Sequence, residues 1–314
     1  NMRIGVVDDT GNVIEKVIIP TRVELGANAI ITNLTTEISS LKLRFEDVNT
    51  PLSAIGIAAA GQVDANTGNI KFGPNLNWND VPIAYVLQKN LNMPVFVAND
   101  VRAATFGEWR FGSAKGMQDY ICLFIGTGIG GGIVSDGVLM TGCNNSAGEI
   151  GHMVISGQGE LCTCGNLGCW ETQAAGWGIA KLTQEAIRKD PKKGSKILAR
   201  AHDKLDQVNA KHLFQALIDH DPLAEFLMRG IEKALIDGST SLVNIFNPEC
   251  LVFGGGIIDG APWLIDVIDK GVRRQALKSA TEKLKILPAQ NFKDAPIIGI
   301  ATMAMEKIQS HKTL

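Results

Sequence analysis

The chain has 314 residues, 45% of them hydrophobic, and a chain longer than about 250–300 residues usually divides into two domains. Thirty Lys and Arg residues against 32 Asp and Glu residues leave a formal net charge of −2. Such a surface has no general attraction for nucleic acid or for an anionic membrane, so we expect a small-molecule partner.

The first third of the chain predicts strands that alternate with helices. MRIGVVDD and VIEKVIIP flank a turn at residues 10–12, which predicts a hairpin. Residues 54–61 and 94–100 are short apolar runs that end in Gly or polar residues, a pattern typical of buried parallel strands with functional residues at their carboxyl ends. Helical apolar spacing covers residues 29–43, 81–91 and 100–109.

The remainder of the chain repeats this plan. Residues 120–140 predict three strands joined by a glycine turn and by a turn at Asp136 and Gly137. The elements expected after them are a helix over 223–246, a strand with glycines over 250–257, a helix over 263–277, a strand over 284–287 and a helix over 295–308. The basic run 188–196 contains Pro191 and Gly194 and is interpreted as a solvated loop. We therefore expect a duplicated α/β architecture.

A comparison of the two halves indicates a difference at their first strands. GGIVSDGVLM follows the strand ICLFI and the turn GTGIG, whereas its counterpart RIGVVDDTGNVI has only Asn1 and Met2 before it. The first half as it begins here lacks one strand and one glycine turn, and we expect the natural protein to carry them on about ten further residues before Asn1. A glycine turn between strands can place backbone N–H groups around a phosphate, so part of a phosphate site would be absent with it.

Three of the six cysteines, Cys162, Cys164 and Cys169, lie within eight residues. The sequence has no apolar run of the ~20 residues that span a bilayer and no signal-peptide pattern, so a cytoplasmic, reducing location is expected. Clustered cysteines there are more often metal ligands or catalytic thiols than disulfides. With His152 they would form a Cys₃His zinc set, although the C-x-C spacing leaves ordinary reduced cysteines as an alternative.

Asn99 and Asp100 lie where a predicted strand gives way to a helix. On the residues alone, Asp100 is either a general base or simply the helix N-cap. Asn75 follows Pro74 and is equally well explained as a turn residue. Surface charge is the alternative explanation for Glu149 and Glu171, and tight turns are the alternative for the glycine runs.

At these motifs the sequence resembles the ROK family of sugar kinases and repressors, and most of all its bacterial glucokinases. The motifs are GIAAAGQVD, FGPNLNW, VANDVRAATFGEW, IGTGIGGGIV, GEIGH, CTCGNLGCWE and LVFGGG. The resemblance implies an α/β fold of the duplicated actin-like, hexokinase-like ATPase type, with two lobes and a cleft between them. We expect one lobe over residues 1–118, joined by the terminal helix 295–314, and the other over 119–294 with the zinc loop. Family members begin with a D-x-G-G-T loop that would end just before Asn1.

The resemblance also implies roles for individual residues. Asp100 would be the general base, and His152 would use one ring nitrogen for zinc and the other for the sugar. The residues implied to bind the sugar are Gly61, Asn75, Asn99, Asp100, Glu149, His152 and Glu171. The residues implied to bind ATP, which is accompanied by Mg²⁺, are Gly126, Thr127, Gly128, Gly130, Gly254, Gly255 and Gly256. The residues implied to hold a structural Zn²⁺ are His152, Cys162, Cys164 and Cys169.

The expected function is that of an ATP-dependent hexokinase of carbohydrate metabolism and glycolysis, acting as a homodimer or higher homo-oligomer without nucleic acid or membrane partners. Glucose is the expected substrate and glucose 6-phosphate the product. Three alternatives stay open: a kinase for fructose or N-acetylmannosamine, a sugar-responsive repressor with a DNA-binding helix-turn-helix, and a sugar- and zinc-binding protein without activity.

Overall fold

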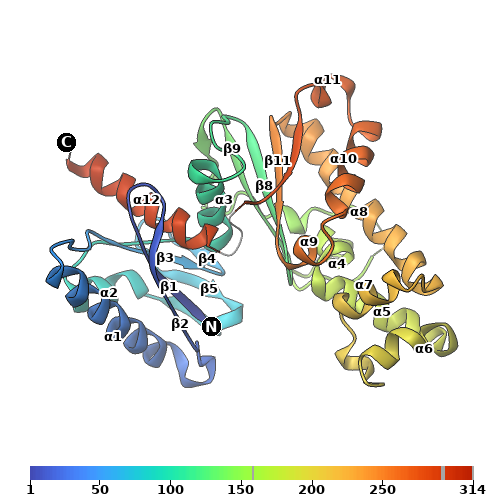
Figure 1. The fold of residues 1–314 in the computed structure, drawn as a ribbon, viewed down its shortest axis with the longest axis horizontal. Coiled ribbons are helices and arrows are strands. Elements are labelled where there is room, and N and C mark those ends of the chain that lie inside the picture. Colours follow the sequence, from blue (N-terminus) through green and yellow to red (C-terminus); the bar gives the residue numbers. More distant parts are fainter. Residues whose placement is uncertain (158, 291–293, 313–314) are drawn as a thin grey trace. The chain divides into compact units, whose positions relative to one another are not determined.

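The computed structural model describes residues 1–157, 159–290 and 294–312, and the chain divides into two compact units (Figure 1). Unit 1 comprises Asn1–Gly116, Thr141–Ala147 and Gln290–Leu314, and unit 2 comprises Met117–Met140 and Gly148–Ala289. The sequence predicted that the second lobe ends at residue 294, next to residues 291–293. It also predicted that the terminal helix ends at residue 314. Residues 291–293, 313 and 314 lie outside the described part of the chain.

The strands of unit 1 form three small sheets. β1 (Met2–Val7) and β2 (Val13–Ile19) make the predicted hairpin, with Gly5 opposite Lys16. β3 (Ile55–Ala59) and β7 (Val95–Asn99) are the predicted parallel pair, with Ile57 opposite Val97. A third, antiparallel sheet was not predicted from the sequence, and it contains β4 (Gln62–Val63), β5 (Ile70–Gly73) and β6 (Trp78–Val81).

Helices cover these sheets. They are α1 (Gly26–Asp47), α2 (Ile83–Leu91), α3 (Asp100–Phe111) and α12 (Ala295–Lys312), with 3-10 turns at Val23–Leu25 and Pro74–Leu76. α12 packs on α3 although the two are far apart in the sequence. Glycines allow this approach: a Cβ on Gly299 would lie 1.7 Å from the carbonyl oxygen of Ala103, and one on Gly107 would lie 2.5 Å from that of Ala295. The two helices therefore meet backbone to backbone.

Unit 2 is built on one five-stranded sheet of order β10-β9-β8-β11-β12. β8 (Tyr120–Ile125) is its central strand, and all six of its residues are buried. β9 (Ile129–Ser135) runs antiparallel to β8, and β11 (Cys250–Gly254) runs parallel to it. β10 (Val138–Leu139) and β12 (Lys285–Pro288) complete the edges. A strand surrounded on both faces reads as a continuous apolar run, as YICLFI does.

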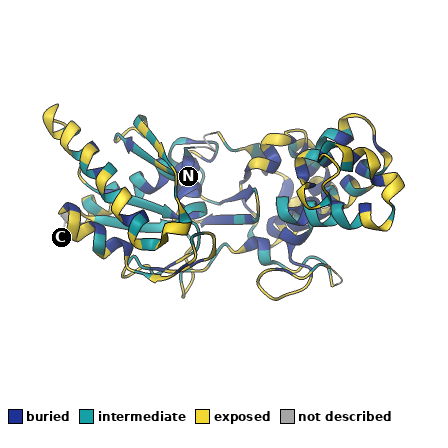
Figure 2. Ribbon diagram, turned by 90° about the horizontal axis from the view of Figure 1, so that it is seen from below, coloured by how far each residue is buried: buried dark blue, intermediate teal, exposed yellow. Residues whose placement is uncertain are grey.

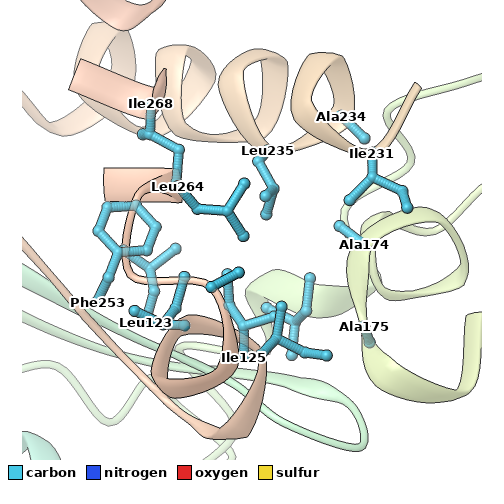
Figure 3. Close-up of a cluster of buried hydrophobic side chains, with 14 of the residues drawn as sticks. Leu123, Ile125, Ala174, Ala175, Ile231, Ala234, Leu235, Phe253, Leu264 and Ile268 are labelled. Atoms are coloured by element: carbon cyan, nitrogen blue, oxygen red, sulfur yellow. The ribbon is translucent and has the colours of Figure 1, made fainter. Parts of the chain in front are cut away.

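The helices of unit 2 pack against that sheet and against one another. They are α4 (Trp170–Ala174), α5 (Gly176–Lys189), α6 (Pro191–Arg200), α7 (Ala210–Ile218), α8 (Pro222–Phe246), α9 (Gly256–Gly260), α10 (Leu264–Gln275) and α11 (Lys278–Thr281), with 3-10 turns at Ile150–His152 and Leu205–Gln207. Leu123 and Phe253 of the sheet meet Leu235 of α8 and Leu264 of α10 in one apolar core (Figure 3). Unit 1 has a separate core between α1, α2 and its strands, so each unit carries its own buried residues (dark blue in Figure 2).

The interpretation of the basic run 188–196 as a loop is wrong. α5 continues to Lys189, and α6 begins directly at Pro191. Asp190 caps α6, since its side chain accepts a hydrogen bond from the Lys193 backbone N–H, and proline at the first helical position needs no donor. Among the described residues, none of the helices has the length and the apolar character needed to cross a bilayer.

Candidate functional site

The start of α3 holds the two polar residues that were singled out at the end of a strand. The N-cap is Asn99, whose Oδ1 accepts hydrogen bonds from the backbone N–H groups of Val101 (3.0 Å) and Arg102 (3.2 Å). Asp100 is the first residue of the helix, and its Oδ1 accepts from the Val101 N–H at 2.9 Å. The alternative that Asp100 is the N-cap is therefore wrong, because Asn99 has that role.

Asp100 lies in a partly buried position within unit 1. Burial raises the pKa of its carboxyl group above 3.8, opposed by the backbone hydrogen bond from Val101. A raised pKa makes the carboxylate a better proton acceptor. Asp100 and Asn75 line the same cavity of unit 1, so the structure brings these two predicted residues to one space.

Gly61 lies beside Asn99. The Asn99 Nδ2 donates to the Gly61 carbonyl oxygen at 3.1 Å, which ties the end of β7 to the segment after β3. Gly61 has φ 134°, and a Cβ there would lie 2.2 Å from the Phe72 carbonyl oxygen. Only glycine fits this backbone. Three of the four unit 1 candidates, Gly61, Asn99 and Asp100, are thus held as one group.

A buried arginine that the sequence analysis did not single out extends this group. Arg102 is 6% exposed, and its guanidinium donates to Asn145 Oδ1, to the Asn145 carbonyl oxygen (2.6 Å) and to the Ala147 carbonyl oxygen (3.2 Å). Asn145 Nδ2 donates to the Val63 carbonyl oxygen at 2.7 Å. The segment Thr141–Ala147 is therefore fixed to α3 and to β4. In the sequence, Arg102 could have been noticed as the one charged residue inside the otherwise largely apolar motif VRAATF.

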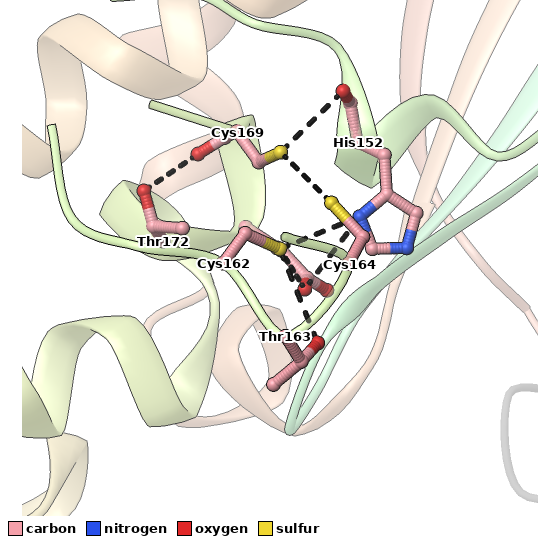
Figure 4. A network of polar contacts seen from close by, with 7 residues as sticks. His152, Cys162, Thr163, Cys164, Cys169 and Thr172 are labelled. Carbon is pink, nitrogen blue, oxygen red and sulfur yellow. Dashed lines mark hydrogen bonds and ion pairs between the residues drawn. The ribbon is translucent and has the colours of Figure 1, made fainter. Parts of the chain in front are cut away.

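In unit 2, one His and three Cys side chains gather as the spacing predicted (Figure 4). The ligand atoms of His152, Cys162, Cys164 and Cys169 all lie within 4.8 Å of one another. Cys162 Sγ is 3.5 Å from His152 Nδ1, and Cys164 Sγ is 3.6 Å from Cys169 Sγ. His152 thus turns Nδ1 toward the thiols.

These separations fit a tetrahedral zinc ion. Two sulfurs bound at about 2.3 Å in a tetrahedron lie about 3.8 Å apart, close to the separations found here. The main-chain N–H of Asn166 is the largest influence on Cys164 and lowers the pKa of that thiol, whereas burial raises the pKa of Cys169 to about 12. Three cysteine sulfurs and one imidazole nitrogen are a usual ligand set of structural zinc sites, so the residues present suit a zinc ion.

The two predicted acidic residues of unit 2 differ in their surroundings. Glu171 is nearly buried at the start of α4, with Oε1 3.1 Å from Cys162 Sγ and 3.8 Å from His152 Nδ1. Glu149 is exposed and precedes the 3-10 turn Ile150–His152. The structure therefore places Glu171 inside the Cys and His cluster and Glu149 at the border of the same loop.

The glycine runs lie at the carboxyl ends of two adjacent parallel strands. The turn Gly126–Gly128 follows β8, and the run Gly254–Gly256 leads from the last residue of β11, the neighbour of β8, into the first residue of α9. Gly255 has φ 103°, and a Cβ there would lie 2.3 Å from the carbonyl oxygen of Ile125, the last residue of β8, so the second run packs against the end of that strand. A Cβ on Gly126 or Gly256 would meet no described atom within 4 Å.

The other predicted nucleotide residues are placed differently. The carbonyl oxygens of Gly126 and Thr127 accept the N–H groups of Gly176 and Trp177, which fix the turn to α5. Gly130 lies within β9, opposite Phe124, rather than in the turn. A Cβ on Gly128 would lie 2.9 Å from Glu171 Oε2, so the turn lies next to the Cys and His cluster.

Comparison with known proteins identifies the family. The model of the ROK family matches residues 1–307. The chain belongs to the ROK family. It is 31% identical over 303 residues to the glucokinase of Streptomyces coelicolor, covering 96% of this chain and 93% of that protein. It is also 31% identical to the glucokinase of Thermotoga maritima, covering 97% of this chain and 94% of that protein.

Solved structures of the family share the fold. A ROK glucokinase from Streptomyces griseus in complex with glucose and AMPPNP matches with a TM-score of 0.79 and 30% identity, covering 96% of this chain and 95% of that chain. A ROK hexokinase from Thermus thermophilus matches with a TM-score of 0.81 and 27% identity, covering 98% and 100%. The predicted α/β fold of the actin-like ATPase type is thereby confirmed. A xylose repressor of Bacillus spizizenii is 32% identical over 255 residues, covering 81% of this chain and 62% of that protein.

Proposed function

We propose that this ROK protein transfers the γ-phosphoryl group of ATP to a hexose, with glucose as substrate. The observation that carries the proposal is the start of α3, where Asn99 caps the helix and Asp100 is left as a partly buried carboxylate of raised pKa. The similarity to glucokinases over nearly their whole length supports the choice of reaction and of sugar.

Asp100 is proposed as the general base. It would accept the proton of the sugar hydroxyl while that oxygen attacks the γ-phosphorus and the bond to the leaving ADP oxygen breaks. The N-terminus of α3 stabilises the ionised carboxylate, which keeps it available as an acceptor. The remaining proposed sugar ligands are Gly61, Asn75 and Asn99 of unit 1 and Glu149, His152 and Glu171 of unit 2.

The two glycine runs of unit 2 are proposed to bind ATP. Gly126 and Gly256 have open space where a side chain would stand, and both follow the carboxyl ends of neighbouring parallel strands, where α/β folds bind their ligands. Backbone N–H groups can approach phosphate oxygens there because no Cβ intervenes. Mg²⁺ bound mainly by phosphates and water would accompany the nucleotide.

A structural zinc ion is proposed for His152, Cys162, Cys164 and Cys169. Four protein ligands leave no open position for water, so the ion would supply folding energy and rigidity and not Lewis-acid chemistry. Because Nδ1 of His152 faces the thiols, Nε2 stays available for a sugar hydroxyl. The metal would thereby fix the loop that carries His152 and adjoins Glu171.

A second candidate function is sugar sensing without phosphorylation. It is favoured by the 32% identity to a xylose repressor, a level similar to that shared with the glucokinases. Sugar ligands and zinc would be common to both functions, whereas a base in the position of Asp100 is needed only for phosphoryl transfer.

A hexose screen with ATP tests the proposal. The purified chain is incubated with ATP, Mg²⁺ and glucose, fructose, N-acetylmannosamine or xylose, and the sugar phosphate is measured by mass spectrometry. We expect glucose 6-phosphate as the main product. Sugar binding in calorimetry without any phosphorylated sugar would contradict the kinase proposal and favour the sensor. Preferred turnover of another hexose would correct the substrate alone.

A further inference from the structure

The start of α5 is capped by the glycine turn of unit 2. The N-cap residue of α5 is Ala175, whose side chain cannot accept a hydrogen bond from the first N–H groups of the helix. Instead, the Gly176 N–H donates to the Gly126 carbonyl oxygen at 2.8 Å, and the Trp177 N–H donates to the Thr127 carbonyl oxygen at 3.1 Å. The turn therefore caps the helix, and the helix in return fixes two peptide groups of the turn.

These two hydrogen bonds determine the direction of the N–H groups in the turn. In a planar trans peptide group the C=O and the N–H point in opposite directions. The carbonyl groups of Gly126 and Thr127 point toward α5, so the N–H groups of the same peptide bonds, which belong to Thr127 and Gly128, point away from it. Thr127 is exposed. The turn thus presents two N–H groups on the side opposite α5, an arrangement that suits a phosphate.

The helix α4 connects the start of α5 to the Cys and His cluster. Cys169 is the N-cap of α4, and the Thr172 hydroxyl donates to the Cys169 carbonyl oxygen at 2.7 Å (Figure 4). Only Ala175 separates α4 from α5. A Cβ on Gly178 would lie 2.3 Å from the Thr172 carbonyl oxygen, so the two helices pack backbone to backbone. A displacement of Cys169 would therefore move the first turn of α5.

Glu171 provides a second connection between the cluster and the turn. Its Oε1 lies 3.1 Å from Cys162 Sγ, and its Oε2 lies where a Cβ on Gly128 would approach to 2.9 Å. The residue is 7% exposed, so its carboxylate has little room to move. One buried carboxylate therefore contacts a cluster cysteine with one oxygen and the turn with the other.

A third connection lies where the turn ends and β9 begins. A Cβ on Gly151 would lie 2.1 Å from the carbonyl oxygen of Ile129, the first residue of β9. Gly151 belongs to the 3-10 turn that ends at His152. The segment that carries the histidine of the cluster therefore packs directly on the residue that follows the glycine turn.

We propose that the Cys and His cluster orients the glycine turn Gly126–Gly128, through α4, the start of α5 and Glu171, so that zinc occupancy of the cluster regulates nucleotide affinity. This proposal rests on the proposed function, in which the turn binds the phosphates of ATP. The first turn of α5 acts as a positioning element, because it sets the direction of the Thr127 and Gly128 N–H groups without contacting the nucleotide itself.

Metal removal tests the proposal. Zinc-loaded parent protein is compared with parent protein stripped by a chelator that is then dialysed away. Calorimetry measures the Kd of AMPPNP with Mg²⁺, and hydrogen exchange without nucleotide follows residues 126–129. We expect stripping to raise the Kd about tenfold, a usual size for coupling between two sites, and to speed exchange at 126–129. Added Zn²⁺ should restore both, while exchange at 250–254 in β11 stays slow throughout.

The outcomes separate this proposal from the proposed function. An AMPPNP Kd that is the same with and without zinc overturns the coupling alone, as does unchanged exchange at 126–129. Parent protein that binds no AMPPNP refutes the nucleotide role of the turn and the coupling with it. Faster exchange at 250–254 would mean that stripping unfolds unit 2, and the variant below, which keeps the metal, then decides.

Gly176→Ala tests the link through α5 with the cluster intact. A Cβ on Gly176 would lie 2.9 Å from the Gly126 carbonyl oxygen, so the turn must shift. We expect the AMPPNP Kd to rise roughly three- to tenfold, as for the loss of about one hydrogen bond, with zinc content and glucose affinity unchanged. Gly230→Ala, in α8, is the matched control, because a Cβ there would meet no described atom within 4 Å. An unchanged AMPPNP Kd in Gly176→Ala would overturn the proposal, and an equal loss of glucose affinity would contradict a specific effect on the turn.

Discussion

The candidate residues of the two units are held in place by different means. In unit 1, Asn99 and Asp100 belong to the first turn of α3, and the helix cap and the Asn99 bond to Gly61 orient them. In unit 2, His152 and Glu171 border a loop with little regular structure, and the Cys and His cluster ties its ends. A helix orients its own first residues, whereas a short glycine-rich loop needs a cross-link to do the same. The predictions below probe this difference.

The largest expected effect is on catalysis by unit 1. Asp100→Asn keeps the shape of the side chain and removes the proton acceptor, so kcat should fall by roughly 10²–10⁴-fold while sugar affinity changes little. Steady-state kinetics and glucose calorimetry measure the two quantities. Equal turnover by parent and variant would refute the base assignment, and lost sugar binding at unchanged kcat would recast Asp100 as a sugar ligand.

The next prediction concerns the cross-link of unit 2. We expect about one zinc per chain, and Cys164→Ala should reduce it to below roughly a tenth, because only three ligands remain. Cys143→Ala, at an exposed cysteine outside the cluster, is the matched control and should keep the metal. Metal analysis and hydrogen exchange provide the readouts.

Hydrogen exchange distinguishes the helix cap of α3 in unit 1 from the proposed metal cross-link in unit 2. Loss of the metal should speed exchange at residues 152–169 and leave the first turns of α3 unchanged, because α3 does not depend on the cluster. Zinc-free parent protein with slow exchange over 152–169 would contradict the proposed role of the metal.

A smaller effect is expected where Arg102 anchors the segment Thr141–Ala147. Asn145→Ala removes the side-chain acceptor of the Arg102 guanidinium, whose bonds to two backbone carbonyl oxygens remain, and the donor to the Val63 carbonyl oxygen, so the free energy of unfolding should fall by about 1–3 kcal/mol. Asn144→Ala, the exposed neighbour, should change it little. Denaturant unfolding measures both variants, and equal stabilities would show that Asn145 is not an anchor.

The smallest effect concerns the pH dependence of stability. Burial raises the pKa of folded Asp100, so the folded state binds the proton more tightly than the unfolded state, and this contribution to stability is lost as pH rises from about 3.8 through the folded pKa. Asp100→Asn lacks the charge and should therefore melt at a higher temperature than the parent at pH 7, with the difference disappearing at pH 3. A variant that is less stable than the parent at pH 7 would contradict this sign.

Long apolar runs were the part of the fold that the sequence predicted well. The hairpin at residues 2–19, the buried strands and α8 all follow from the spacing of apolar residues along one element. The strands of the β4-β5-β6 sheet are two to four residues long, too short for a period to show. α6 was missed because Pro191 and Gly194 look like helix breakers, although proline suits the first helical position.

The candidate site was predicted where neighbours in sequence are neighbours in space. The Cys and His cluster comes from eighteen consecutive positions, 152–169, and its members meet as expected. The N-cap explanation offered for Asp100 placed the cap of α3 one residue too late, because Asn99 and Asp100 are both good N-caps and only the backbone shows which one has the extended conformation. The bond between Arg102 and Asn145 joins distant segments, and no local pattern reveals it.

The chain order of unit 1 has a consequence for its biosynthesis. Its three segments are separated by those of unit 2, and α12, the last helix, packs on α3, β1 and β3. During translation all residues of unit 2 are therefore synthesised before α12. Until α12 has been made, the earlier segments of unit 1 expose the apolar faces that α12 covers in the folded protein. Domains usually fold in the order of synthesis, but here the later unit can close first, so chaperone binding during translation should concentrate on residues 1–116.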